Sequence, residues 1–151
     1  MKSFGIRIND SNEGIINVKL FDILKTIPNG ESYYWSILFL DAFGIIDEDK
    51  PNPGFSNQIS AMENGYLISW DDLSRLAKSI EQIISILIIG CKDQKLLVRY
   101  VNDQTMYETC DFAIEMIDSA FWEVFSKNKD FILKLAAKFK ETEFLETDFE
   151  P

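Results

Sequence analysis

The sequence contains no histidine, and its 151 residues include only two cysteines. Histidine is the side chain most often used for general acid–base catalysis, for activating a serine or cysteine nucleophile and for binding transition metals. A structural zinc site needs four cysteine or histidine ligands, which one chain of this composition does not have. These absences remove most enzyme chemistry, and we expect no enzyme activity, no metal and no cofactor.

Closely spaced glycines and long apolar runs are also lacking. The seven glycines are too far apart in the chain to form a phosphate-binding loop. The most apolar run, residues 83–89, is interrupted by Ser85 and followed by Gly90, whereas a membrane-spanning helix takes about 20 residues. The first ten residues contain no apolar stretch of the kind found in secretory signals. We therefore expect a cytoplasmic protein that does not cross a membrane.

Basic residues are outnumbered, with 15 Lys and Arg against 25 Asp and Glu, so the net charge is −10. A nucleic acid ligand needs a basic face to neutralise phosphates, and an anionic membrane surface needs one too. The sequence therefore predicts that neither is a partner.

What remains is the composition of an ordinary folded domain, with 46% hydrophobic and 26% charged residues. A chain of this length forms one domain, here residues 1–151, and buries enough surface to need no disulfide. We accordingly expect Cys91 and Cys110 to be reduced thiols.

The apolar spacing in the first half of the chain predicts two strands and two helices. Strands are expected at residues 4–8 and 33–43, where apolar residues alternate or dominate. A helix is expected at 15–27, and another should begin at Trp70 and run to Gly90, with a capping box at its start. Residues 47–65 carry several prolines and glycines and are expected to be irregular.

The second half predicts an antiparallel meander followed by a helix. Strands are expected at 96–101, 111–117 and 120–126, and Asn128 or Asp130 should cap a helix ending near Phe139. The acidic end, from residue 141, should fray. The order of these elements predicts an α+β fold with a mixed or antiparallel sheet, a C-terminal meander and about three helices.

Three motifs in the sequence suggest chemistry. Asp47 and Asp49 resemble the start of a calcium loop, but the later ligand and glycine positions do not match. The Ser126 and Lys129 pair has the spacing of a nucleophile and its base but stands at a predicted helix cap. Carboxylate pairs leave one enzymatic alternative open, in which Glu115, Asp118 or Glu123 line a cleft and have raised pKa values.

The charges are unevenly distributed along the chain. Residues 41–72 hold seven acids and one base, residues 101–126 hold six acids and no base, and residues 127–140 hold five lysines and one acid. If the two acidic stretches lie together, they form a negative docking face for a basic protein, although a solubilising surface explains them equally well. The residues predicted to bind such a partner are Asp47, Glu48, Asp49, Tyr66, Asp71, Asp72, Glu115, Asp118 and Glu123.

Residues 118–126, with the sequence DSAFWEVFS, and the helix expected after them look like the strand-then-helix ending of several bacterial immunity proteins. The whole profile, small, acidic and without catalytic motifs, also resembles the immunity proteins of toxin–immunity systems, including those of contact-dependent inhibition. The resemblance implies a cytoplasmic protein that blocks a basic toxin domain, often a nuclease, with an acidic surface.

A second interpretation is a secretion or assembly chaperone acting as a homodimer, since such proteins are also small, acidic and cytosolic. An apolar groove and a stable homodimer would favour the chaperone, whereas a monomer that binds one basic protein tightly would favour immunity. The sequence does not decide the oligomeric state.

Overall fold

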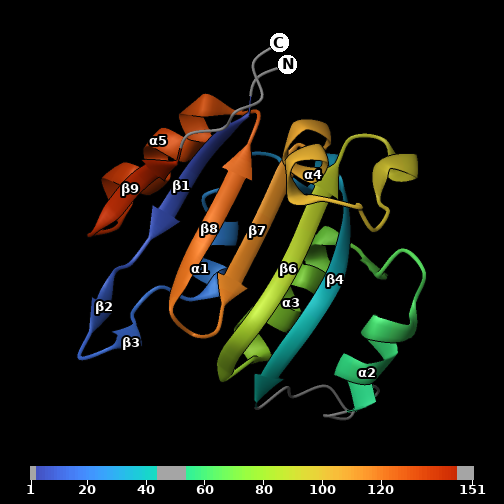
Figure 1. Cartoon of the computed structure of the whole chain (residues 1–151), viewed down its shortest axis with the longest axis horizontal. Helices are drawn as coiled ribbons and strands as arrows, with labels where there is room; N and C mark the ends of the chain where they lie inside the picture. The colour runs from blue at the N-terminus through green and yellow to red at the C-terminus, as the bar shows by residue number, and fades with distance from the viewer. Residues whose placement is uncertain (1–2, 44–53, 146–151) are drawn as a thin grey trace.

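The structure, a computed structural model, describes residues 3–43 and 54–145. Within these ranges seven strands form one antiparallel sheet in the order β5-β4-β6-β7-β8-β1-β9, seen face-on in Figure 1. A separate hairpin consists of β2 (Ser11–Asn12) and β3 (Ile15–Ile16). The strands of the sheet are β1 (Phe4–Ile8), β4 (Tyr34–Phe43), β5 (Tyr66–Ile68), β6 (Gln82–Cys91), β7 (Phe112–Ile117), β8 (Phe121–Ser126) and β9 (Thr142–Leu145).

Helices cover one face of the sheet more fully than the other. In Figure 1, α1 and α3 lie behind the sheet, while α4 lies in front of its upper end. No helix of the described residues is long and apolar enough to cross a membrane. The α-helices of this part are α1 (Leu20–Leu24), α2 (Gly54–Ala61), α3 (Trp70–Ser79), α4 (Asp103–Thr109) and α5 (Lys129–Lys138). The described part also contains two short 3-10 helices, η1 (Gly30–Ser32) and η2 (Gln94–Leu96).

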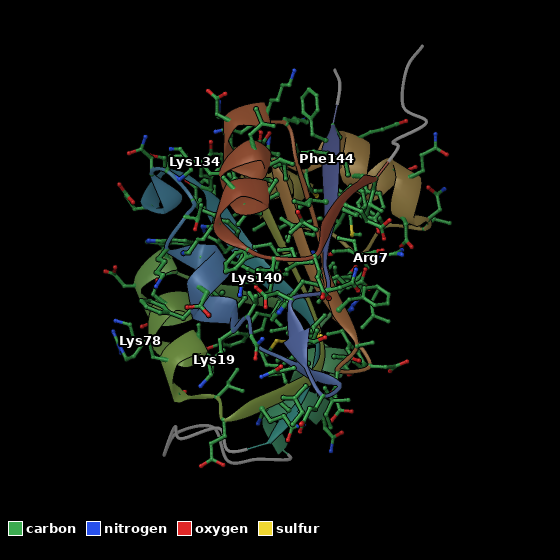
Figure 2. The ribbon with its side chains drawn as sticks, turned by 90° about the vertical axis from the view of Figure 1, so that its left-hand side faces the viewer. Arg7, Lys19, Lys78, Lys134, Lys140 and Phe144 are labelled. Carbon is green, nitrogen blue, oxygen red and sulfur yellow. The ribbon has the colours of Figure 1, made fainter. Side chains whose placement is uncertain are left out.

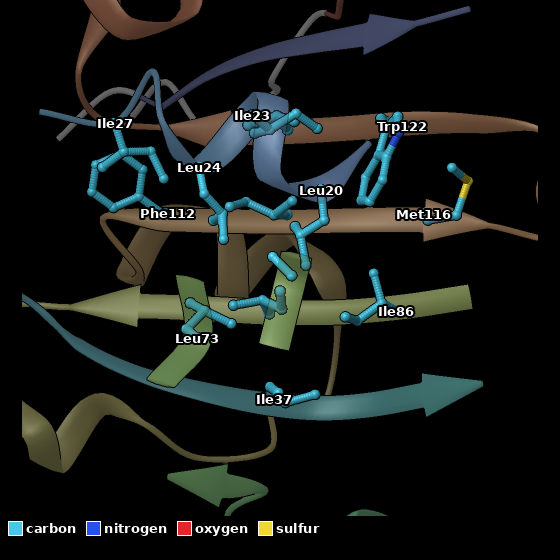
Figure 3. Close-up of a cluster of buried hydrophobic side chains, with 14 of the residues drawn as sticks. Leu20, Ile23, Leu24, Ile27, Ile37, Leu73, Ile86, Phe112, Met116 and Trp122 are labelled. Atoms are coloured by element: carbon cyan, nitrogen blue, oxygen red, sulfur yellow. The ribbon is translucent and has the colours of Figure 1, made fainter. Parts of the chain in front are cut away.

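The main core lies between the sheet and α1, α3 and α5. Alternate residues of each central strand face these helices because side chains point to opposite faces along a strand. Figure 3 shows Leu20, Ile23 and Leu24 of α1 packed towards the strands. Trp35 stacks with Phe112 at 5.5 Å between ring centroids and lies 5.1 Å from Trp70. Each large apolar side chain buried here contributes about 1.5–3 kcal/mol.

A smaller apolar cluster lies on the opposite face, beneath α4. Met106 and Cys110 of the α4 segment pack there with Ile89 and Phe125 of the sheet. Cys91 and Cys110 are buried in this cluster as free thiols. Because α4 has only seven residues, the cluster covers part of this face, and none of the described helices lies in front of the lower ends of β6, β7 and β8 (Figure 1).

The α+β fold with a large antiparallel sheet is confirmed. The strand predicted at 4–8 is β1, and α3 begins at Trp70 with the Ser69 hydroxyl oxygen accepting a hydrogen bond of 3.1 Å from the Asp72 amide. The Asn128 side chain caps α5 by accepting from the Phe131 amide at 3.1 Å. In each case the local pattern was enough to place the element.

The helix predicted from Trp70 to Gly90 is wrong in its second half. It ends at Ser79, and Gln82–Cys91 form β6 at the middle of the sheet. A central strand that packs on both faces is apolar throughout, and such a run fits helical spacing as well as a strand. Packing against β4 and β7 decides the outcome, and β-branched residues favour the strand.

Other predicted elements differ in length or type. Residues 96–101 form no strand, so the predicted meander is not confirmed, although β7 and β8 form the expected hairpin. The predicted helix at 15–27 is reduced to Leu20–Leu24. The described part holds five α-helices rather than three, and α2 lies inside the stretch expected to be irregular. Thr142–Leu145 pair with β1 rather than fray.

Candidate functional site

The residues predicted to bind a partner do not share one face of the molecule. Tyr66 lies on β5 opposite Ile37 and packs against the main core. Asp71 and Asp72 stand in the first turn of α3, in the helix layer, where a carboxylate favours the positive end of the helix. Asp72 also pairs with Arg75 at 3.2 Å. All three therefore lie on the helix side.

The other described candidates lie on β7, β8 and the turn between them. Glu115 and Glu123 point to the face that carries α4, while Asp118 is exposed in the turn, where its amide donates to the Ser85 hydroxyl at 3.1 Å. Asp47, Glu48 and Asp49 lie outside the described residues. Among the candidates that the structure describes, Glu115 and Glu123 are the two that it brings together from different strands.

Glu115 and Glu123 are cross-strand partners in the β7–β8 ladder. Side chains directly opposite each other in an antiparallel pair are about 5 Å apart at Cβ, so two carboxylates there repel. Burial, together with the nearby charges of Asp103 and Glu123, raises the pKa of Glu115 from 4.5 to about 7. Glu115 is therefore partly protonated near neutral pH.

The third carboxylate comes from α4. Asp103 is the first residue of this helix, whose start is fixed by the Asn102 side chain accepting from the Thr105 amide at 2.8 Å. One turn later, Tyr107 stacks on Phe125 with 3.7 Å between ring centroids. Burial and the carboxylates of Glu115, Asp103 and Glu123 raise the pKa of Tyr107, so its hydroxyl stays protonated beside them.

One guanidinium group offsets these charges. Arg7 of β1 donates to Glu123 from Nη2 at 2.6 Å and from Nε at 2.9 Å, and its Nη1 reaches Glu143 of β9 at 3.3 Å. It also lies over the Phe121 ring, 4.5 Å from the centroid. We call the group Arg7, Asp103, Glu115, Glu123 and Glu143 the acidic sheet face; it has four carboxylates and one guanidinium.

Several lysines project on the helix side of the sheet. Lysines of α5 and of the segments around α1 and α3 project there, and Figure 2 shows Lys78 and Lys134 on that side, away from Arg7. Lys138 donates to the Asp22 carbonyl at 3.1 Å, and burial and the charge of Lys25 lower its pKa. Lys134 and Lys138 of the basic strip predicted at 127–140 thus lie on the helix side, which they share with Asp71 and Asp72, whereas Lys127 donates to the Thr109 carbonyl at the end of α4.

The acidic sheet face suits the binding of cationic groups. Within the described residues no group of three His, Cys, Asp or Glu side chains is arranged to hold a metal ion. Cavities of about 410 and 430 Å³ open elsewhere, one beside the β2–β3 hairpin and one between Lys92 and Lys127, and neither is lined by Glu115 or Glu123. These two carboxylates therefore lie on a sheet surface outside both cavities.

Sequence reasoning missed Arg7 and Glu143. Arg7 stands 116 residues from Glu123 and 136 from Glu143, and only the placement of β1 between β8 and β9 brings the three together. The alternation of Phe4, Ile6 and Ile8 was the only local indication, since it places Arg7 on the face opposite the core.

No family model, curated protein or solved structure matches this chain.

Proposed function

We propose that this protein is a non-enzymatic protein-binding module, an immunity protein of a bacterial toxin–immunity system that acts in the cytoplasm. It neutralises a basic toxin domain, such as a nuclease, by binding it through the acidic sheet face. The observation that carries the proposal is the pair Glu115 and Glu123, two carboxylates held opposite each other on a sheet surface.

The pair costs stability in the free protein. Like charges directly opposite each other on neighbouring strands destabilise a sheet, by up to about 1 kcal/mol. Arg7 does not relieve Glu115, because the groups it binds are Glu123 and Glu143. A lysine or arginine of a partner, placed between Glu115 and Asp103, would turn this repulsion into attraction and draw Glu115 into its charged form.

Two further features support a protein partner. Tyr107 and Phe121 lie among the carboxylates, and aromatic residues are enriched at protein interfaces. Lys78 and Lys134 project on the helix side, away from the acidic sheet face (Figure 2). In the field of a basic partner, such a difference between two sides speeds association and favours one docking direction.

The carboxylate enzyme considered from the sequence is less well supported. The raised pKa of Glu115 meets one of its two requirements. The other is a cleft, and neither of the two cavities described above contains Glu115 or Glu123.

A homodimeric chaperone is the second candidate, because β9 is the last strand of the sheet and carries Phe144, which is 61% exposed. An open edge strand is a template for pairing with a second copy.

The proposal is tested by using the tagged protein to capture partners from the lysate of its native organism, followed by mass spectrometry and a light-scattering mass. We expect one stoichiometric basic protein that is toxic when expressed alone and harmless when co-expressed with this chain. A homodimer that elutes alone would favour the chaperone, and a captured protein without toxicity would contradict the immunity function.

A matched pair of variants locates the binding surface. Asp103→Asn with Glu115→Gln removes two carboxylates from the acidic sheet face and leaves both partners of Arg7 in place. Asp71→Asn with Asp72→Asn removes two carboxylates from the helix side. We expect the first variant to capture less of the protein than the wild type does and the second to capture as much. The reverse result would place the interface on the helix side.

A further inference from the structure

A cavity of about 410 Å³ opens on the helix side of the sheet, at the end of the main core. It lies between the β2–β3 hairpin, the start of α1, the end of α3 and the β7–β8 turn. Protein interiors are close-packed, and voids larger than a water molecule are few. Cavities that bind small molecules range from about 300 to 1,000 Å³, so this one is large enough to hold a ligand.

The floor of the cavity is apolar and belongs to the core. Trp122, Met116, Leu20 and Val18 line it, and each is 4% exposed or less. Figure 3 shows Trp122 and Met116 at one end of the packed cluster. The Trp122 indole N–H already donates to the Val18 carbonyl at 2.8 Å, so the floor presents hydrocarbon and ring surface rather than an unsatisfied polar group.

The β2–β3 hairpin forms one wall of the cavity. Its strands pair at two positions, and its turn places Glu13 and Gly14 in the left-handed region. Ile15 and Ile16 line the cavity from this hairpin, yet Ile15 is 71% exposed. An isoleucine left in solvent beside an apolar cavity gains by burial when a molecule fills the space between them.

Polar groups stand among the lining residues as well. Lys19 and Glu81 are exposed, and Ser119 is half-buried in the β7–β8 turn. One cation, one anion and a hydroxyl are suited to contact a single polar head group while the floor takes an apolar chain. The occupant is a small molecule rather than a protein surface, because the space is concave and its floor is part of the core.

We propose that this cavity binds an apolar small molecule that carries one polar head group. The chain lies against Trp122 and Met116, the head group stays with Lys19 and Glu81, and Ile15 closes over the ligand. This site is separate from the acidic sheet face, because Trp122 and Met116 point towards the helices whereas Glu115 and Glu123 point away from them.

The test is a titration of the ¹⁵N-labelled protein with decanol, decanoate and decylamine, followed through the indole N–H signals of the three tryptophans. We expect a saturable shift of the Trp122 signal, with Trp35 and Trp70 as internal controls because neither lines the cavity. A preference for decanoate would indicate that the head group contacts Lys19, and a preference for decylamine that it contacts Glu81. Equal affinity for the three compounds would indicate that the apolar chain alone provides the binding. Absence of a saturable shift with all three compounds, or equal shifts of all three indoles, would overturn the proposal.

A matched pair of variants checks the role of the hairpin. Ile15→Asp should weaken binding about tenfold or more, because it removes apolar surface that the ligand covers. Val101→Asp makes the same kind of change at a fully exposed position outside the cavity lining and should leave the affinity unchanged. Both positions are exposed, so both variants should fold. Equal affinity of the two variants would contradict the proposed site.

Discussion

Glu115 on β7 lies directly opposite Glu123 on β8, on the sheet face away from the main core. Glu123 is bound by Arg7, while Glu115 is half-buried beside Asp103 and has a pKa of about 7. Glu115 is therefore partly protonated near neutral pH, while the carboxylate opposite it is held by the Arg7 guanidinium.

The pKa of Glu115 predicts a pH dependence of stability. In the unfolded chain the group titrates near 4.5, and in the folded protein near 7, so between these values the folded state holds the extra proton. Stability should fall as the pH rises from about 4.5 to 7 and then level off for this group. Glu115→Gln should remove this fall and raise the free energy of unfolding at pH 8 by about 1–2 kcal/mol, a figure reduced for the partial exposure of the site. Urea unfolding of the wild type and of Glu115→Gln at pH 5 and pH 8 measures this difference in unfolding free energy. An equal pH dependence in the two proteins would refute the prediction.

Arg7 should matter more than an ordinary surface cation. Arg7→Met leaves Glu123, 13% exposed, without its guanidinium partner and beside Glu115. We expect a loss of about 1–2 kcal/mol of unfolding free energy. Arg75→Met is the control, because its pair with Asp72 is 76% and 57% exposed and should contribute less than about 0.5 kcal/mol. Similar losses of unfolding free energy in the two variants would mean that leaving Glu123 unpaired beside Glu115 does not destabilise the acidic sheet face.

Arg99 should hold α2 against the sheet. Its guanidinium donates to the carbonyls of Leu38 at 2.7 Å, Ile59 at 2.9 Å and Met62 at 3.2 Å. These hydrogen bonds connect the irregular part of β4, where its pairing with β6 shifts register, to the end of α2. Arg99→Met should cost about 1–2 kcal/mol, since two part-buried carbonyls and one exposed carbonyl lose their donor. Amide hydrogen exchange in α2 should speed up more than in α5. Arg99→Lys should recover only part of the loss, because a lysine cannot reach three acceptors in one plane. Unchanged exchange in α2 would contradict this role.

Gly90 should be intolerant of a side chain for a packing reason. A Cβ there would lie 2.6 Å from a ring carbon of Trp35, which is buried and stacked on Phe112. Gly90→Ala should therefore destabilise the protein by about 1–3 kcal/mol. Gly14→Ala provides a comparison, since nothing lies near its Cβ and its left-handed backbone alone should cost about 1 kcal/mol. The prediction fails if thermal unfolding finds Gly90→Ala no less stable than Gly14→Ala.

The sequence predicted elements whose information is local. Ser69 and Asn128 mark helix starts, and the alternation of residues 4–8 marks a strand, because caps and period-2 patterns depend on neighbouring residues. Residues 82–91 form a strand where the spacing predicts a helix, because a strand packed on both faces is apolar at most of its positions, and such a run fits both spacings.

The site was predictable only in part. Glu115 and Glu123 belong to one hairpin, so an acidic stretch with a tight turn was enough to place them together. The contacts of Arg7 depend on pairings with β8 and β9, more than one hundred residues away. Asp71 and Asp72 were equally acidic candidates, but whether they share a face with Glu115 depends on the side of the sheet that α3 covers.

The most direct test of the account is the association rate of the captured toxic protein with the two double variants, measured at pH 8, where Glu115 is largely ionised. The account predicts that Asp103→Asn with Glu115→Gln slows association and weakens affinity about tenfold, while Asp71→Asn with Asp72→Asn has a much smaller effect. The wild-type rate should also fall with added salt, because charges are screened beyond about 8 Å at physiological ionic strength. Equal effects of the two variants, or a rate independent of salt, would contradict binding through the acidic sheet face.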